Sequence, residues 1–251
     1  MNGIQDGVAV VTGAGSGIGR ETARRFAREG ASVVVADVDE DGGHNTVELI
    51  TDDGGEAMFV HTDVTDRGDV DRMVGTALDE YGGLDFAHNN AGIEGDNAPL
   101  ADDTEENWDA VIDVNLKGVW RCMQAEIPAM LERSGGRIVN TASISGQTGS
   151  GGAPYVASKH GVIGLTRKAA VDYSGEDLRV NAVCPGIIQT PMIDRAQEDS
   201  AELLEQMTAA TPAGRLGEPE EIASAVVWLC SDDASFVMGH PFTIDGALTV
   251  Q

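Results

Sequence analysis

Short runs of β-branched and other apolar residues alternate with amphipathic stretches along almost the whole chain, and this alternation limits the possible folds more than any other feature. The expected strands lie at Val8–Thr12, Ser32–Asp37, Ala57–His61, Leu84–Asn89, Arg137–Thr141, Arg179–Cys184 and Phe242–Asp245. The expected helices lie at Ile18–Glu29, Gly43–Asp52, Arg67–Tyr81, Glu105–Arg133, Tyr155–Ser174 and Pro219–Cys230. Strands that are apolar on both faces and separated by helices form a parallel sheet covered on both sides. Right-handed crossovers then predict an α/β fold, a Rossmann-type doubly wound parallel sheet of about seven strands.

The 251 residues, 41% of them hydrophobic, suffice for one large domain with a substantial core, which we expect to span residues 1–251. An apolar strand begins within ten residues of the N-terminus, and no basic segment precedes a long apolar one, so we expect neither a signal peptide nor a membrane anchor. The three cysteines are far apart in apolar surroundings, as buried thiols in a reducing compartment are, and the five histidines lack metal-ligand spacing. We therefore expect a cytoplasmic protein without a transition-metal site.

Acidic residues outnumber basic ones by 42 to 16, which gives a net charge of −26, and only three of the basic residues are lysines. Such a surface repels nucleic acid and anionic membranes, and its self-repulsion destabilises the folded state in dilute buffer. At about 1 M salt the Debye length falls to about 3 Å, and this repulsion largely disappears. The composition resembles that of proteins from salt-accumulating microbes and predicts a halophilic protein. The alternative is a merely acidic mesophilic protein.

A glycine-rich loop, Thr12–Gly19, follows the first expected strand and opens the first helix. Its glycines let the backbone turn tightly beside a pyrophosphate, whose charge the helix N-terminus favours. Gly13 and Gly17 have three residues between them, unlike the glycines of G-x-G-x-x-G, but the strand–loop–helix context favours a nucleotide site.

Asp37 ends the second expected strand. A carboxylate there can accept hydrogen bonds from both hydroxyls of an adenosine ribose, and it would repel a 2′-phosphate. We therefore expect NAD rather than NADP as the cofactor, against the simpler interpretation of Asp37 as a turn aspartate. Asp63 and Val64 could flank the adenine, and the small residues of Asn89–Gly92 would let the backbone pass close to the cofactor.

Tyr155 and Lys159 stand four residues apart, which places a phenol and an ammonium on one face of a helix. Tyrosine loses its proton near pH 10, and a lysine held beside it favours the phenolate. The pair suits the removal of a proton from an alcohol or its return to a carbonyl oxygen. Surface neighbours have the same spacing, so the surrounding motifs decide its meaning.

Taken together, these motifs resemble the short-chain dehydrogenase/reductase family in its single-domain form, from about Gly7 to Gly246. The resemblance rests on Thr12-Gly-x-x-x-Gly-x-Gly19, Asp63-Val64, Asn89-Asn-Ala-Gly92, Asn115, Ser143, Tyr155-x-x-x-Lys159 and Arg179–Gly186. It implies a cofactor-binding part over about residues 7–145 and a catalytic and substrate part over about residues 143–250. It also implies a homotetramer in which the helices at Glu105–Arg133 and Tyr155–Ser174 pair across subunits.

The resemblance further implies a catalytic tetrad of Asn115, Ser143, Tyr155 and Lys159. Tyr155 would be the general acid/base, Lys159 would lower its pKa and bind the nicotinamide ribose, and Ser143 would donate to the substrate oxygen. Ser145 is a rival to Ser143, but the Ser-x-x-Gly pattern of the family selects Ser143. Asn115 would kink its helix and hold a water that links Lys159 to solvent. The implied cofactor contacts are Gly13, Ser16, Gly17, Ile18, Gly19, Asp37, Asp63, Val64, Asn90, Ala91, Gly92, Tyr155, Lys159, Pro185, Gly186, Ile188 and Thr190.

The segment between Thr190 and Arg215 should cover the substrate. Its apolar residues are Met192, Ile193, Leu203, Leu204 and Met207. At helical spacing these residues predict either core positions or an adaptable apolar lid over the substrate. The segment has no cluster of arginines that would bind a carboxylate or phosphate of the substrate, although Arg195 and Arg215 keep that option open. We expect an enzyme of CH–OH groups that transfers a hydride between NAD and a neutral secondary alcohol or ketone, with a cyclic alcohol or a sugar such as glucose as candidates. The alternatives are a 3-oxoacyl-thioester reductase, which would normally prefer NADPH, and a non-catalytic NAD-sensing protein on the same fold.

Overall fold

The computed structural model describes residues 1–133, 135–190, 193 and 201–250, without the side chains of residues 201–204. Met192 and Arg195, expected near the substrate, lie outside the described residues, as do the side chains of Leu203 and Leu204. Within the described ranges, none of the helices combines the length and the apolar character that crossing a bilayer requires.

Seven parallel strands form one sheet in this part of the chain, and each expected strand is present with its ends shifted by at most two residues. The strands are β1 (Val8–Thr12), β2 (Ser32–Asp37), β3 (Glu56–His61), β4 (Phe86–Asn89), β5 (Gly136–Thr141), β6 (Leu178–Pro185) and β7 (Pro241–Ile244). The α-helices are α1 (Gly17–Arg28), α2 (Glu40–Asp52), α3 (Arg67–Tyr81), α4 (Glu105–Ile112), α5 (Val119–Leu131), α6 (Ala153–Tyr173), α8 (Ala201–Ala210) and α9 (Pro219–Cys230). The predicted doubly wound fold is confirmed.

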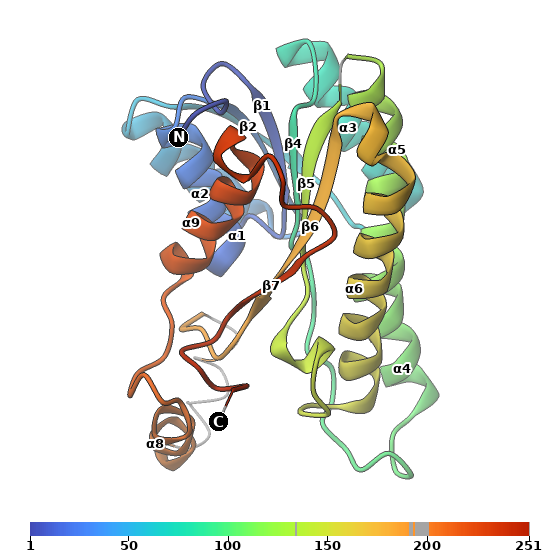
Figure 1. Cartoon of the computed structure of the whole chain (residues 1–251), viewed down its shortest axis with the longest axis vertical. Helices are drawn as coiled ribbons and strands as arrows, with labels where there is room; N and C mark the ends of the chain where they lie inside the picture. Colours follow the sequence, from blue (N-terminus) through green and yellow to red (C-terminus); the bar gives the residue numbers. More distant parts are fainter. Residues whose placement is uncertain (134, 191–192, 194–200, 251) are drawn as a thin grey trace.

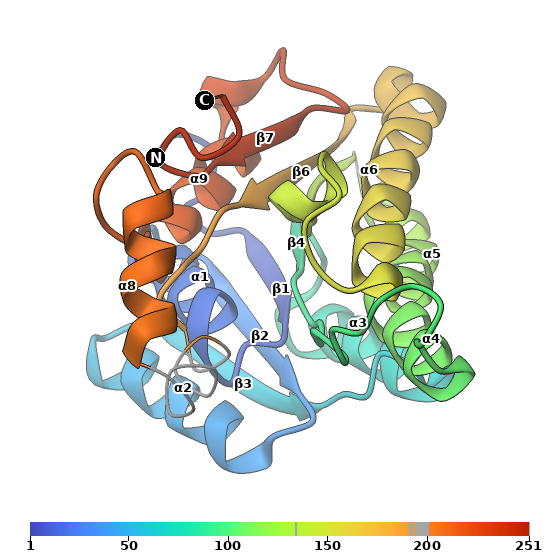
Figure 2. The ribbon, with the colours of Figure 1, turned by 90° about the horizontal axis from the view of Figure 1, so that it is seen from below.

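The strand order is β3-β2-β1-β4-β5-β6-β7, so the chain moves outward from β1 to β3 and then crosses to β4 on the other side of β1. The carboxyl ends of β1 and β4 therefore flank the point at which the order reverses. Ligands of doubly wound folds bind in the crevice at that point. Figure 2 looks onto this end of the sheet, with α8 on one side and α4 on the other.

Helices cover both faces of the sheet, with α1, α2 and α9 on one side and α3, α5 and α6 on the other (Figure 1). Successive residues of a strand face opposite layers. In β1, Val10 belongs to the same buried cluster as Met73 of α3, whereas its neighbour Val11 belongs to the cluster of Phe26 in α1. This two-sided burial explains why the strands appear in the sequence as continuous apolar runs.

The long helix expected at Glu105–Arg133 is interrupted. It runs as α4, then as a π-helical segment over Asp113–Gly118, and continues as α5, which ends at Leu131. π-Helical turns inside α-helices often accompany functional sites. Here the turn contains Asn115, one of the expected tetrad residues.

Candidate active site

The carboxyl ends of the central strands open into a cavity of about 720 Å³. The predicted site residues in its wall are Gly13, Ser16, Gly17, Ile18, Asp37, Asp63, Val64, Asn90, Ala91, Gly92, Ser143, Tyr155, Lys159, Pro185, Gly186, Ile188 and Thr190. Gly19 and Asn115 are absent from that wall. The fold thus brings segments from both halves of the chain to one cavity.

The glycine loop between β1 and α1 leaves the N-terminus of α1 uncapped. Gly13 and Gly17 have φ angles of 63° and 51°, in the left-handed region that residues with a Cβ rarely adopt. Ser16 is the N-cap residue of α1, but its side chain makes no capping hydrogen bond, and the first turn contains no acid. In α3, by contrast, Asp66 caps the helix and Asp69 lies in the first turn. The uncapped positive end of α1 therefore suits the pyrophosphate of a dinucleotide.

Gly19 lies behind this loop. A Cβ at Gly19 would be only 2.0 Å from the carbonyl oxygen of Gly13, so a larger residue would force the helix away from the loop. The structure thus places Gly19 in a packing position, where it sets how closely α1 approaches the loop.

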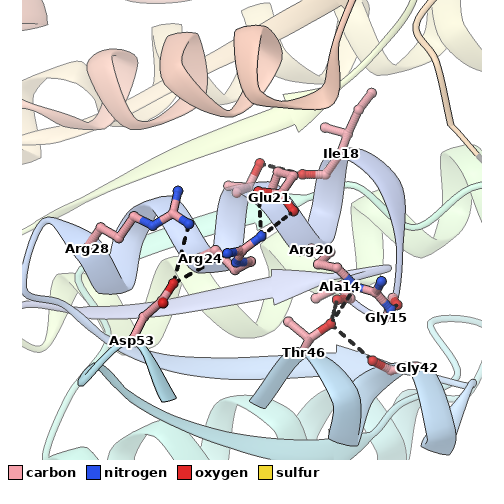
Figure 3. A network of polar contacts seen from close by, with 11 residues as sticks. Ala14, Gly15, Ile18, Arg20, Glu21, Arg24, Arg28, Gly42, Thr46 and Asp53 are labelled. Atoms are coloured by element: carbon pink, nitrogen blue, oxygen red, sulfur yellow. Dashed lines mark hydrogen bonds and ion pairs between the residues drawn. The ribbon is translucent and has the colours of Figure 1, made fainter. Parts of the chain in front are cut away.

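Asp37, at the end of β2, holds the glycine loop with its carboxylate. Its Oδ2 accepts a hydrogen bond from Gly15 N at 2.7 Å, and its Oδ1 accepts one from Asp39 N at 2.9 Å. Arg20, in the first turn of α1, donates to Gly15 O and to the hydroxyl of Thr46 (Figure 3). The hydrogen bonds of the Arg20 guanidinium thus go to Gly15 and Thr46 of the protein, and Arg20 is not part of the cavity wall. The Asp37 carboxylate does form part of that wall.

Asn89–Gly92 follows β4 and is bound to the end of β1. Asn90 Nδ2 donates to the carbonyl oxygens of Thr12 and Gly13, both at 3.2 Å. The hydroxyl of Thr12 accepts hydrogen bonds from Asn90 N at 2.9 Å and from Ala91 N at 3.1 Å. These bonds fix the two strand ends on either side of the crevice, so both can approach a bound cofactor closely.

The remaining predicted contacts lie at the ends of β3 and β6. The Asp63 carboxylate accepts hydrogen bonds from the main-chain N and the hydroxyl of Thr65 at 2.8 and 2.7 Å. Pro185 is the last residue of β6, and Ile188 forms an isolated parallel bridge with Gly217. Both segments are therefore shaped by local hydrogen bonds before any ligand binds.

Tyr155 and Lys159 lie one turn apart on α6, and both reach the cavity. Lys159 Nζ is 5.4 Å from the centre of the Tyr155 ring and donates to the main-chain oxygen of Thr141 at 2.9 Å. Burial lowers the pKa of Lys159 to about 8. The lysine is thus held at the cavity by the end of β5.

Burial also raises the pKa of Tyr155, while a hydrogen bond with Ser143 acts in the opposite direction. We expected Lys159 to lower this pKa. Desolvation of the phenol is the largest effect on this pKa, and the Lys159 ammonium donates to Thr141 O, so the lowering by Lys159 stays a prediction.

Ser143 follows β5 and is the N-cap residue of a short 3₁₀ turn, Ile144–Gly146. Its Oγ accepts a hydrogen bond from Ser145 N at 3.1 Å. That bond leaves the hydroxyl proton free to be donated, and the Ser143 hydroxyl faces the phenol of Tyr155. Ser145 also lines the cavity, so both candidate serines are close to the site.

Asn115 is fully buried and binds the segment that follows β4. Its Oδ1 accepts from Ile93 N at 2.8 Å, and its Nδ2 donates to Ile93 O at 2.7 Å. A Cβ at Gly92 would lie 3.2 Å from Asn115 Oδ1 and 3.6 Å from Lys159 Nζ. Gly92 therefore lies between the side chains of Asn115 and Lys159, and Asn115 itself is not part of the cavity wall.

Three further residues of the wall bear on its chemistry and were not assigned a catalytic or cofactor role from the sequence. Thr141 binds Lys159 through a main-chain oxygen, which no side-chain motif could reveal. The negative charge of Glu94 raises the pKa of Tyr155. Glu94 stands two residues after the motif that ends at Gly92, and this position in the sequence could have indicated that it lies in the cavity wall. Met207 of α8 adds apolar surface to the cavity wall, in keeping with the interpretation of the apolar residues between Thr190 and Arg215 as a lid over the substrate.

Fold and site together define an oxidoreductase with a pyridine-nucleotide site. A family profile described as "Enoyl-(Acyl carrier protein) reductase" matches residues 13–249. Cyclohexanol dehydrogenase from Acinetobacter sp. (strain SE19) is 45% identical over 252 residues, which cover 99% of this chain and 97% of that protein. The structure of levodione reductase matches with a TM-score of 0.95 at 37% identity and covers 98% of each chain. An actinorhodin polyketide ketoreductase variant with NADPH matches with a TM-score of 0.93 at 37% identity and covers 99% of each chain.

The chain belongs to the short-chain dehydrogenase/reductase family. It is an oxidoreductase of secondary alcohols and ketones that uses a pyridine nucleotide.

Proposed function

We propose that the chain is an NAD-dependent dehydrogenase of a neutral secondary alcohol, and reductase of the corresponding ketone, with Tyr155 as the general acid/base. One observation supports this most strongly: a single cavity holds Tyr155, Ser143 and Lys159 together with the glycine loop and Asp37. Groups suited to proton transfer and groups suited to dinucleotide binding thus face the same space.

The proposed proton transfer uses side chains already placed at the cavity. The nicotinamide, when bound, supplies or accepts the hydride. The Tyr155 phenolate accepts the hydroxyl proton during oxidation, and the phenol returns it to the carbonyl oxygen during reduction. Ser143 donates a hydrogen bond to that oxygen and stabilises its developing charge. Lys159, held by Thr141 O, supplies a positive charge that favours the phenolate.

A neutral substrate is supported by the composition of the cavity wall. Its apolar side chains include Ile93, Ile144, Ile187, Ile193 and Met207. Glu94 would repel an anionic substrate, and Lys159 is the only basic side chain in the wall formed by the described residues. A relative with 45% identity is named for cyclohexanol, so an alicyclic alcohol is our first candidate and a sugar such as glucose the second.

A spectrophotometric screen of alcohols and ketones in molar KCl, with NAD(H) and NADP(H) in parallel, tests the proposal. We expect NADH to form with cyclic secondary alcohols. Turnover confined to 3-oxoacyl thioesters with NADPH would support the thioester reductase instead. Tight NADH binding without turnover of any compound would support a non-catalytic NAD-sensing protein.

NAD preference should depend on Asp37. Asp37→Ser should weaken NADH binding by about 10- to 100-fold, because charged hydrogen bonds contribute about 1.5–3 kcal/mol, and should strengthen NADPH binding by removing the repulsion of a 2′-phosphate. Fluorescence titration with both reduced cofactors measures the change. Asp41→Asn, an equal charge change at an exposed position of α2, is the control and should leave both affinities within about twofold. Tighter binding of NADPH than of NADH by the native chain would refute the proposed role of Asp37.

We also propose that the protein is adapted to high salt. Exposed acids gather at helix starts: Asp39 caps α2, and Glu40 and Asp41 lie in its first turn. Their mutual repulsion is screened at about 1 M salt, so the melting temperature should rise between dilute buffer and molar KCl. Calorimetry over a KCl series measures it. A flat or falling melting temperature would support the acidic mesophilic alternative.

A homotetramer of single-domain subunits, each spanning residues 1–251, is a further proposal. Its support is that the helices expected to pair carry exposed large apolar side chains: Trp108 of α4 is 43% exposed, Trp120 of α5 41% and Val171 of α6 77%. Sedimentation in molar KCl should give about four times the chain mass of 26.2 kDa. A particle of one chain mass at micromolar concentration would contradict the proposal.

A further inference from the structure

His88 is a histidine near the end of β4 that has no exposed surface and no part in the proposed reaction. It lies two residues before Asn90, so both side chains leave the chain on the same face. Thr141, the last residue of the neighbouring strand β5, reaches both of them. Its hydroxyl is 2.8 Å from His88 Nε2 and 3.2 Å from Asn90 Oδ1. These three residues, the His88 network, thus run from a buried histidine to two residues of the cavity wall.

The direction of the hydrogen bonds in the His88 network follows from its far end. Asn90 Nδ2 donates to Thr12 O and Gly13 O, so the group that Asn90 turns toward Thr141 is its amide oxygen, which can only accept. The single hydroxyl proton of Thr141 therefore goes to Asn90 Oδ1. His88 Nε2 must then carry a proton and donate it to the Thr141 oxygen.

The other tautomer of His88, with its proton on Nδ1, is unfavourable. It would require Thr141 to turn its proton toward Nε2, and two oxygens would then face each other at 3.2 Å with no proton between them. Nδ1 is buried and has no partner among the described residues, so it makes no hydrogen bond that would favour that tautomer. Burial also lowers the pKa of His88 to about 3, so the ring is neutral and only one of its nitrogens is protonated.

The His88 network ends at the glycine loop. The two carbonyl oxygens that accept from Asn90 belong to Thr12 and Gly13, and Gly13 is part of the cavity wall. If the Asn90 amide turned over, its oxygen would face those two oxygens and both bonds would be lost. We propose that His88 is a positioning residue of the cofactor site, because its bond to Thr141 fixes the orientation in which Asn90 holds the glycine loop. This inference deepens the proposed function and rests on its cofactor site.

Two replacements of similar length separate the donor of His88 from the bulk of its ring. Glutamine carries an N–H the same number of bonds from the main chain as Nε2, whereas methionine ends there in a methyl group. His88→Met should bind the reduced cofactor about 5- to 10-fold more weakly than His88→Gln, because it lacks the hydrogen bond that orients the others. Fluorescence titration measures both affinities. Both variants lose the ring, so a role in packing alone would affect the two affinities alike.

Thr141 provides a second comparison, which does not depend on how well the His88 variants fold. Thr141→Ser keeps the hydroxyl, and Thr141→Val replaces it by a methyl group of similar shape. The valine variant should bind the reduced cofactor about 5- to 10-fold more weakly than the serine variant. Adding His88→Met to Thr141→Val should weaken binding by less than about a further twofold, because both changes interrupt the same network.

Equal cofactor affinities of His88→Met and His88→Gln, or of Thr141→Val and Thr141→Ser, would overturn the proposal. Effects that add in full in the double variant would also overturn it, since the two residues would then act separately. The titrations use whichever of NADH and NADPH binds the native chain more tightly, and they require no turnover. An error in the proposed NAD preference or in the proposed alcohol oxidation would therefore leave this test intact.

Discussion

Replacing Tyr155 by phenylalanine should lower kcat for alcohol oxidation by about 100- to 10,000-fold, the usual contribution of a positioned acid/base. The variant keeps the ring that packs against Lys159 and loses only the hydroxyl that faces Ser143. NADH binding should therefore change little, because the glycine loop and Asp37 do not depend on the phenol. Steady-state kinetics and NADH fluorescence titration on the same preparation separate the two effects.

Tyr173→Phe is the matched control, since Tyr173 is the last residue of the same helix and is absent from the cavity wall. It should keep kcat within about twofold. The pH profile adds a second readout. Because burial raises the pKa of Tyr155, kcat/KM for oxidation by the native chain should still be rising with pH on the alkaline side of neutrality. Tyr155→Phe with more than about a tenth of native kcat would show that another group moves the proton.

The layout of the site followed from the sequence because local patterns determine it. Continuous apolar runs marked the strands, and strand ends carry Asp37 and the motif that ends at Gly92. Four-residue spacing placed Tyr155 and Lys159 on one face of a helix, since that property depends only on helical periodicity. These are short-range features, and the fold then brings them together at one edge of the sheet.

The properties that the sequence did not reveal depend on tertiary partners. The bond of Lys159 to Thr141 O uses a main-chain atom, and the raised pKa of Tyr155 comes from burial, which spacing along a helix does not determine. Arg179 looked like one residue of a strand motif. It is 2% exposed and donates to the carbonyl oxygens of Leu229 and Ser231 at the end of α9. Long-range contacts of this kind have no periodic signal in the chain.

Glu126 is the clearest case of such a hidden property. It lies on α5 with no exposed surface, and its Oε2 accepts a hydrogen bond from Asn89 Nδ2 at 3.0 Å. Its Oε1 is buried and has no partner among the described residues. Burial raises the pKa of Glu126 to about 7, although the bond from Asn89 acts against that rise. The carboxyl group is therefore neutral in the folded chain under mildly acidic conditions.

This raised pKa makes stability depend on pH. Between about pH 4.5 and pH 7 the unfolded chain loses the Glu126 proton while the folded chain keeps it, so the folded state binds more protons and the free energy of unfolding falls as pH rises. Below that window both states are protonated, and above it both are ionised. The difference of about 2.5 between the two pKa values corresponds to about 3 kcal/mol over the window.

Glu126→Gln should remove this dependence, because an amide of the same shape still offers Asn89 an oxygen and never ionises. The stability of the variant relative to the native chain should increase by about 3 kcal/mol as the pH rises from about 4.5 to about 7.5. This increase is equivalent to a change in the melting-temperature difference of roughly 6–12 °C. Denaturant or thermal unfolding at constant ionic strength across this range measures the difference, so that surface screening stays fixed while Glu126 titrates. Glu132→Gln, an exposed residue that follows the same helix, is the control and should show no such divergence. Parallel stability curves for the native chain and Glu126→Gln would mean that the pKa of Glu126 is not raised in the folded chain. The buried carboxylate would then need a cation or water beside Oε1.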